Sequence, residues 1–215
     1  MPTTWTQIDT ELGVILEDPS SVSYGSSLRI ACFNRAMEYF AVTHTALFKT
    51  ASASADADYV VPYPEDFLDL PDGGVEVLWK DKRRWLEMQE MIPGTALPKE
   101  GYAKMHNGIK LFTLEFEELK LWYFSKYPAV VNGNSQILLP AWSHWAIINL
   151  TCAYMLYPGM MNQQLLRQFQ TRRDAGSPDD NPPRTQAKFL MMVYLDTVSK
   201  VKTQDRGYIM REGRL

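Results

Sequence analysis

The hydrophobic pattern is densest in residues 139–157, LPAWSHWAIINLTCAYMLY, where apolar side chains occupy nearly every face of a predicted helix. Pro140 suits the first turn of a helix, because its missing N–H costs no hydrogen bond there, and Pro158-Gly159 ends the segment. No charged residue occurs between Pro128 and Leu166. A helix that is apolar nearly all round lies either at the centre of a bundle or in a membrane.

A membrane helix is the less favoured interpretation of this segment. Ser143, His144, Asn149 and Thr151 are costly in hydrocarbon, and the flanks lack the Lys and Arg residues that orient membrane helices. We therefore predict a core helix that the rest of the chain surrounds. The side chains expected to be buried together are Phe33, Met37, Phe40, Trp142, Trp145 and Leu150.

Two helices are predicted before this core helix. The first spans Thr4–Leu16, where Thr4 and Gln7 match the capping-box pattern. The second spans about 26–49 and carries apolar residues at a regular spacing of three and four. His44 lies on that apolar stripe, so a hydrogen-bonded core histidine is favoured over a metal ligand or a base.

Between residues 59 and 127 the pattern changes to short extended segments, preceded by a small-residue linker over 50–58. Asn107-Gly108 between two extended runs is a strong hairpin signal. A short helix is predicted over Trp85–Met91. About five short strands are expected, at 59–61, 75–79, 101–105, 109–112 and 118–124.

Two helices are predicted after the core helix. The first spans about 162–174, and the second spans Thr185–Thr203. The apolar face expected for the last helix is imperfect and consists of Phe189, Met192, Leu195 or Asp196, and Val198.

These elements together predict a mainly α fold, a bundle of about four to five helices that carries a small antiparallel β subdomain. We expect a single domain over 1–215, with helices in 1–50 and 138–203, a β-rich insertion over 59–127 and a C-terminal tail over 204–215.

Charge and cysteine usage change this picture little. The net charge is −3, which excludes a nucleic-acid binder by bulk charge, although the chain from residue 163 onward is basic and the rest is acidic. That asymmetry suits head-to-tail packing between copies or is a chance imbalance. Cys32 and Cys152 occupy apolar helical positions and are expected to be buried thiols in a reducing, cytoplasm-like compartment. The N-terminus shows no secretory signal.

The sequence contains no recognisable catalytic motif, and we expect no catalytic, cofactor-binding or metal-binding residue. His44, His106 and His144 lack ligand-like spacing, and a metal site made by His44 and His144 is disfavoured because structural zinc usually needs four ligands. The acidic run Glu115, Glu117 and Glu118 is better explained by an exposed turn than by acid–base chemistry.

Two segments are candidates for contact with other molecules. Lys80, Lys82, Arg83 and Arg84 form a basic cluster beside Trp79 and Trp85, which either binds nucleic acid or is a solvated hairpin tip. The tail over 204–215 is either an end without a role or a segment that is mobile in the free subunit and docks on a partner. Its candidate docking residues are Arg206, Tyr208, Ile209, Met210, Arg211 and Arg214.

The order of the parts resembles the head-to-tail adaptor proteins of tailed bacteriophages, also called connector or head-completion proteins. In that family an extended Y-x-x-P-x-D-F segment follows the second helix, and a strand ending in L-x-L-x-Y-Y/F-x-x-x-P precedes the long core helix. The matching residues of the first motif are Tyr59, Pro62 or Pro64, Asp66 and Phe67, and those of the second are Leu119, Leu121, Tyr123, Phe124 and Pro128. The likeness covers roughly residues 26–166, with a longer spacer over 85–99 than the family pattern.

The resemblance implies a structural virion protein and no enzyme. Such a protein forms a homo-oligomeric ring, twelvefold by family resemblance, beneath the portal protein. The ring extends the DNA channel without sequence-specific binding and provides the docking surface for tail or nozzle proteins. It would be located at the virion neck, and in the host cytoplasm during assembly, without contacting a membrane. The alternatives are a non-catalytic nucleic-acid-binding module and an enzyme with a scattered, unrecognised site.

Overall fold

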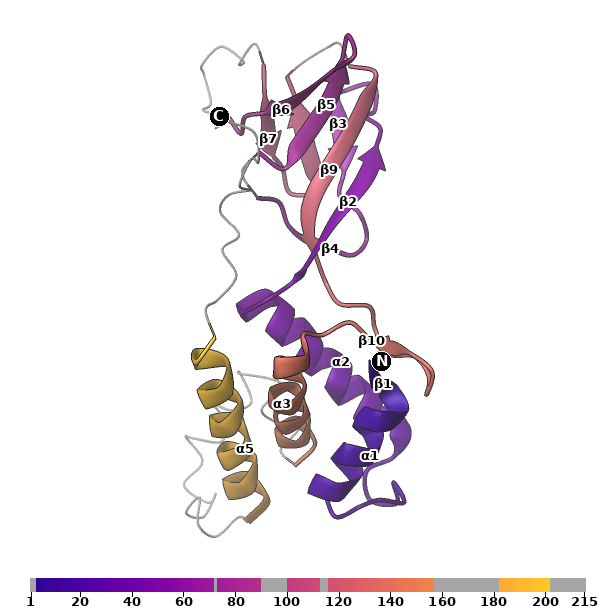
Figure 1. Cartoon of the computed structure of the whole chain (residues 1–215), viewed down its shortest axis with the longest axis vertical. Coiled ribbons are helices and arrows are strands. Elements are labelled where there is room, and N and C mark those ends of the chain that lie inside the picture. Colours follow the sequence, from indigo (N-terminus) through magenta and orange to yellow (C-terminus); the bar gives the residue numbers. More distant parts are fainter. Residues whose placement is uncertain (1–2, 72, 90–99, 113–115, 157–181, 202–215) are drawn as a thin grey trace. The chain divides into compact units, whose positions relative to one another are not determined.

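The computed structural model describes residues 3–71, 73–89, 100–112, 116–156 and 182–201 (Figure 1). The chain separates into two compact units. Met1–His44 and Tyr127–Thr203 belong to one, called the helical unit here, and Thr45–Lys126 makes up the body of the other, called the β unit. Each unit has its own buried side chains and is considered by itself.

The expectation of a mainly α fold is wrong, because the structure is a mixture of α and β. Within its described residues it has four α-helices, one 3-10 helix and three antiparallel sheets. The helices are α1 (Trp5–Ile15), α2 (Ser26–Thr43), η1 (Ala141–Ser143), α3 (His144–Leu156) and α5 (Pro182–Ser199). The extra strands come from segments that lack a clear period-2 alternation. For such segments the sequence predicts helix, linker or turn instead of strand.

Helix α3 is the core of the helical unit, as its all-round apolar pattern predicts. Every residue from Ala146 to Met155 is buried, and α1, α2 and α5 all pack against this helix. Phe33, Met37, Phe40 and Leu150 are buried as expected. The predicted fold of this unit is thus right at its centre, and the predicted helix over 162–174 lies outside the described residues.

The prediction that two tryptophans belong to this core is wrong. Trp142 is 37% exposed and Trp145 is 53% exposed. Asn149 and Cys152 follow Trp145 on the same face of α3 at helical spacing, and both are buried. Trp145 is therefore exposed because it lies in the first turn of α3, and not because its face of the helix lacks neighbours.

The predicted apolar face of the last helix is also wrong. In α5 the buried residues are Ala187 and Leu190, followed by Tyr194, whereas Phe189 is 63% exposed and Met192 is 66% exposed. Two apolar stripes overlap in this helix, and its contact with α3 selects the one that periodicity did not favour.

Polar contacts hold the N-terminal part of the helical unit together. Gln7 Oε1 accepts a hydrogen bond from the Thr4 backbone N–H at 2.9 Å, in the predicted capping box at the start of α1. Strand β1 (Thr3–Thr4) pairs with β10 (Gln136–Ile137). The Asn34 side chain donates to the Val130 carbonyl at 3.0 Å and accepts from its N–H at 2.8 Å, which fixes the segment after the β unit to α2.

The β unit contains two sheets whose inner faces share one core. The first sheet has the order β2-β9-β5-β6, with β4 also paired to β9, and the second has the order β3-β8-β7. A parallel bridge between Met88 and Tyr102 links the two sheets. The strands are β2 (Leu47–Ala53), β3 (Val60–Pro62), β4 (Phe67–Asp69), β5 (Val75–Trp79), β6 (Lys82–Leu86), β7 (Tyr102–Lys104), β8 (Gly108–Leu111) and β9 (Glu118–Ser125).

Several strand predictions are confirmed by these bounds. β5 and β9 lie where expected, and β7 and β8 form the antiparallel hairpin expected here, with residues 105–107 as its loop and Gly108 as the first residue of β8. Gly108 is required at its position, because a side chain there would collide with the Val61 carbonyl.

Other element predictions in this region are wrong. Helix α2 ends at Thr43, and the segment expected to be helix end and linker is strand β2, which pairs along its whole length with β9. The region is therefore β-rich from Leu47 and holds more than five strands. The short helix expected over 85–91 is contradicted at its start, because Trp85 and Leu86 belong to β6. The cause is tertiary pairing, which decides between helix and strand for short apolar runs.

Candidate functional site

The hairpin of β5 and β6 presents the predicted basic cluster. Five residue pairs join the two strands, from Val75 with Leu86 to Trp79 with Lys82. The two-residue turn between them, Lys80-Asp81, has left-handed φ angles of 49° and 60°. Such a turn matches the twist of the strands, so the hairpin continues to its tip without a loose loop.

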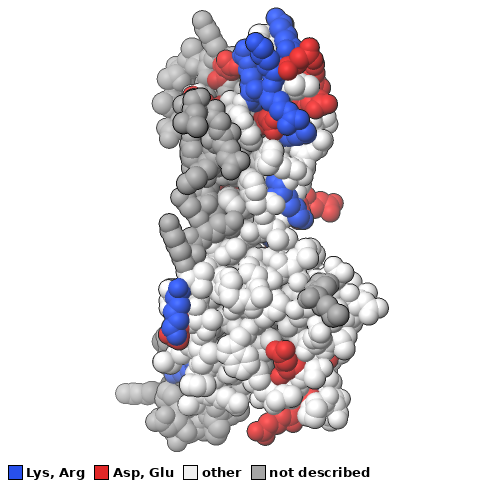
Figure 2. All heavy atoms as spheres, viewed as in Figure 1, with Lys and Arg blue, Asp and Glu red and all other residues white. Residues whose placement is uncertain are grey.

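The cations of the hairpin are exposed, and some are held in place. Residues 80–84 are all exposed. The Trp79 ring carries two of them, with the Lys80 Nζ atom at 4.4 Å and the Arg84 Cζ atom at 4.1 Å from its centroid. Figure 2 shows Lys and Arg side chains gathered at one end of the β unit, with acidic side chains at the margins.

A buried carboxylate lies beside this cluster. Glu76 of β5 is only 4% exposed. Its Oε2 atom accepts the Trp122 Nε1–H at 2.8 Å, and its Oε1 atom is 3.4 Å from Arg83 Nη1. The contacts join three strands, since Trp122 lies on β9 and Arg83 on β6.

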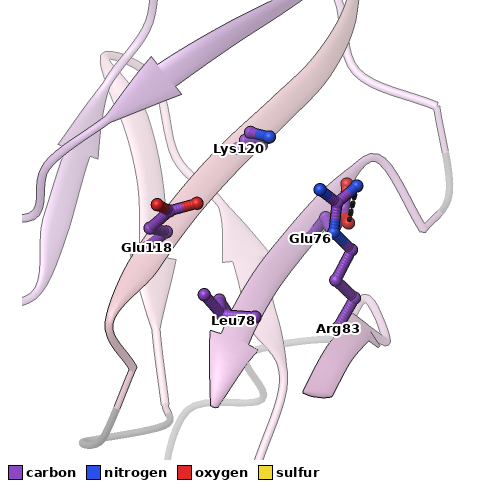
Figure 3. A pocket seen from close by; sticks show the side chains of 5 residues that line it. All are labelled: Glu76, Leu78, Arg83, Glu118 and Lys120. Atoms are coloured by element: carbon purple, nitrogen blue, oxygen red, sulfur yellow. Dashed lines mark ion pairs between the residues drawn. The ribbon is translucent and has the colours of Figure 1, made fainter. Parts of the chain in front are cut away.

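The side chains around Glu76 enclose a small hollow on the outer face of the first sheet (Figure 3). Its lining residues are Glu76, Leu78, Arg83, Glu118 and Lys120. Its cavity volume of about 10 Å³ lies far below the range of about 300–1,000 Å³ that is usual for small-molecule sites. The lining holds two carboxylates and two cations, which suits ion pairing at a surface better than binding of a small ligand.

An aromatic row crosses the same face of the sheet. Trp122 lies between Trp85, at 5.5 Å between ring centroids, and Phe48, at 5.9 Å, and Phe48 also contacts Phe124 at 5.3 Å. The rings are tilted by 33–50° to each other, between a parallel stack and an edge-to-face arrangement. Phe48 is 45% exposed, which leaves the β2 end of the row open to solvent.

A second polar cluster joins the two motifs on which the family resemblance rests. Asp66 accepts a hydrogen bond from the Tyr123 hydroxyl at 2.9 Å and is 2.5 Å from Lys49 Nζ. The Phe67 ring stacks on Tyr63 at 3.8 Å and lies 6.0 Å from Tyr123. β4, which begins at Phe67, also pairs with β9. The two motifs, more than fifty residues apart, therefore form one contact site.

The ionisable groups of this cluster are shifted in opposite directions. Burial, and then the hydrogen bond to the Asp66 carboxylate, raises the pKa of Tyr123 to about 12. Burial opposes the ionisation of Asp66, but the hydrogen bonds from Lys49 and Tyr123 outweigh it and hold the pKa of Asp66 below its ordinary value. At neutral pH the phenol is thus neutral and the carboxyl is ionised.

His44 and the two cysteines have contacts that indicate a structural role. The His44 Nε2 atom lies 3.1 Å from the carbonyl oxygens of both Val198 and Val201, and its ring stacks on Phe40. Both cysteines are buried free thiols, as predicted, and burial raises the pKa of Cys152 to about 12.

His144 makes different contacts from His44. Its Nε2 atom is 3.1 Å from the Leu139 carbonyl oxygen. Among the described residues no group of three or more His, Cys, Asp or Glu side chains is arranged to hold a metal ion. In the same part of the chain no helix is long and apolar enough to cross a membrane.

The candidate residues of the sequence are placed unequally by the structure. Lys80, Lys82, Arg83 and Arg84 lie together at the hairpin tip. The candidate tail residues Arg206, Tyr208, Ile209, Met210, Arg211 and Arg214 lie outside the described residues, as does Glu115.

Sequence reasoning missed Glu76, Phe48 and Lys120 as members of the outer face. The pairing register brings them together, with Glu76 opposite Lys120 and Phe48 opposite Phe124. Strand alternation identifies which residues share a face of one strand, but it does not show which strands are neighbours.

Comparison with known proteins adds no family assignment: no protein-family model matches the chain, and no curated protein matches it.

Proposed function

We propose that this chain is a structural head-to-tail adaptor of a tailed bacteriophage. It would form a ring of identical copies beneath the portal protein, extend the DNA channel and offer a docking surface to tail or nozzle proteins. Its place would be the neck of the virion. The support is the resemblance in the order of parts, together with one observation on the residues that carry it.

That observation is the contact between the two motifs. Asp66 and Phe67 of the first motif bind and stack against Tyr123 of the second, and β4 pairs with β9. Two weak patterns that match independently would have no reason to meet in space. Because the two motifs form one contact site, we treat them as parts of a single structural element. That element joins β4 to β9, the strand that leads back to the helical unit.

Exposed apolar side chains of the helical unit supply material for contacts between copies. Trp145 on α3 is 53% exposed, and Phe189 and Met192 project from α5. Large apolar side chains that stay exposed on a subunit are typical of interaction surfaces. In a ring one patch meets a different patch of the neighbour, so the two helices need not present identical surfaces. The tail residues Arg206–Arg214 remain the proposed contact with the portal.

The test is assembly with the portal protein of the phage that carries the chain. The purified chain, alone and mixed with portal, is examined by sedimentation velocity and negative-stain electron microscopy. We expect rings seated on the portal. Trp145→Ser and Met192→Ser should reduce ring formation, whereas Val22→Ser, which removes an even more exposed apolar side chain from a loop, should not. A chain that stays monomeric with portal at high concentration would contradict the proposal.

A further inference from the structure

The tip of the β5–β6 hairpin is a local positive charge on an acidic unit. Residues 45–126 contain fourteen Asp and Glu but only ten Lys and Arg, yet residues 80–84 contain four cations and one anion. Lys80 and Lys82 form no ion pair with any other residue that the structure describes. The carboxylates nearest to Arg83 and Arg84 are 3.4 and 3.6 Å away, and both arginine side chains are exposed.

The tip also holds its cations in a defined arrangement. The Lys80 and Arg84 side chains lie against the Trp79 ring, which limits the rotamers of both. Successive residues of β6 point to opposite faces of the hairpin. Lys82 and Arg84 therefore project from one face, and Arg83 projects from the other. Lys120 of β9 lines the hollow beside Arg83, but Glu76 and Glu118 line it too, so the hollow adds no net charge to that face (Figure 3).

We propose that this tip contacts the phosphate backbone of double-stranded DNA without reading its sequence. The inference rests on the proposed function, in which DNA passes through the channel of the ring. Lys and Arg side chains that reach phosphates release counterions and give affinity independent of sequence. This narrow hairpin carries cations on both faces and at its end. Such an arrangement fits the negatively charged phosphate backbone of a duplex.

Stacking on unpaired bases fits this site less well. The Trp79 ring carries Lys80 and Arg84, and the Trp85 and Trp122 rings pack against each other at 5.5 Å. A single-strand platform needs open aromatic faces on which successive bases stack. The backbone of a duplex requires only the cations, which are the accessible groups of this tip.

The experiment measures the salt dependence of binding between the full chain and a fluorescent duplex by anisotropy. Four phosphate contacts per chain predict a slope of log K against log salt of about −3.6, and loss of two contacts a slope of about −1.8. The test variant is Lys80→Gln with Lys82→Gln. The matched control is Arg35→Gln with Lys200→Gln, which removes two exposed cations of the helical unit and changes the net charge equally.

The proposal predicts the lower slope for the hairpin variant and an unchanged slope for the control. Equal losses in both variants would mean attraction by overall charge and would overturn it, as would an absence of binding at about 50 mM salt. Polyglutamate that competes as well as duplex at equal charge would point to an acidic protein partner instead, and so would also overturn it. Ring assembly on the portal is scored separately, so a chain that forms rings but does not bind DNA refutes only this inference.

Discussion

Arg29 is the most deeply buried charge of the helical unit, and its removal tests how that unit is held together. The side chain is 1% exposed. Its Nε atom donates to the Tyr24 carbonyl at 2.9 Å, and its Nη1 atom donates to the Asp9 carbonyl at 3.3 Å and to the Asp9 carboxylate at 3.2 Å. Its Nη2 atom donates to the Asp18 carbonyl and, at 3.1 Å, to the Asp18 carboxylate. One guanidinium group therefore joins α1, the loop after it and α2.

The perturbation is Arg29→Met, which keeps much of the volume and removes every one of these donors. Breaking a buried ion pair by removing one partner costs about 3–5 kcal/mol, because the remaining polar groups stay buried without donors. For a chain of this length 1 kcal/mol shifts the Tm by about 2–4 °C, so the expected loss is about 6–20 °C. The loss should fall on the unfolding transition of the helical unit.

Differential scanning calorimetry with circular dichroism measures this loss, and Arg35→Met is the matched control. Arg35 lies on the same helix, is 52% exposed and pairs with Glu38 three residues away. Exposed pairs of this kind contribute about 0.3–0.5 kcal/mol, so this variant should melt close to the wild type. If Arg29→Met melts within about 2 °C of the wild type, the reasoning about Arg29 is refuted.

The pH dependence of the stability distinguishes the contribution of Asp18 from that of Arg29. The Tyr24 backbone N–H is the largest cause that lowers the pKa of Asp18, and Arg29 is a smaller one. A carboxyl with a lowered pKa stabilises the fold above its ordinary pKa and loses that contribution as the pH falls through the folded value. Arg29→Met should therefore retain most of the loss of stability that Asp18 causes below about pH 4, whereas Asp18→Asn should abolish that contribution.

Four further outcomes are expected. Phe33→Ala should cost about 3–5 kcal/mol in denaturant unfolding because its ring is fully buried, while Trp145→Ala should change the Tm little, and equal losses would contradict the described core. The Tyr123 phenol, with its pKa raised by burial to about 12, stabilises the fold below about pH 10 and loses this effect as the pH rises through 12; Tyr123→Phe should remove that part of the alkaline decline. Deleting residues 204–215 should leave the melting temperature nearly unchanged but weaken incorporation into heads, and a truncated chain that assembles normally would refute the docking tail. His44→Gln should lower stability and abolish no turnover, and metal analysis that finds an ion on this histidine would contradict the expectation.

The sequence predicts the structure well where one element determines its own surroundings. The capping pattern of Thr4 and Gln7 places α1, and the apolar run over 144–156 identifies α3 as the central helix. Both signals are local, since a cap acts within one turn and an apolar helix is buried by whatever packs on it. The hairpin of β7 and β8 belongs to the same class, because its turn signal lies within a few neighbouring residues, although Gly108 itself begins β8.

The prediction fails where a partner that is distant in sequence decides the outcome. Residues 47–53 have no strong period, and they are a strand because β9 pairs with all seven of them. Glu76 gives no sign in sequence of its contact with Trp122, which depends on the neighbouring positions of β5 and β9. In the sequence Arg29 resembles any exposed helical cation. Its burial depends on its contacts with Asp9 and Asp18, which the sequence does not reveal. Register and long-range pairing carry this information, and a single sequence does not contain them in readable form.

The family resemblance is intermediate between these two cases. Its motifs were matched by residue type and order, and the structure brings Asp66 and Tyr123 within 2.9 Å of each other. A carboxylate and a phenol that hydrogen-bond across two strands constrain each other, because substituting Asp66 removes the acceptor of the Tyr123 hydroxyl, and substituting Tyr123 removes one of the two side-chain donors to Asp66. Such a pair gives a physical reason for the two motifs to occur together in one chain. It supports the adaptor proposal through structure, and the portal and DNA experiments then test the two functional steps separately.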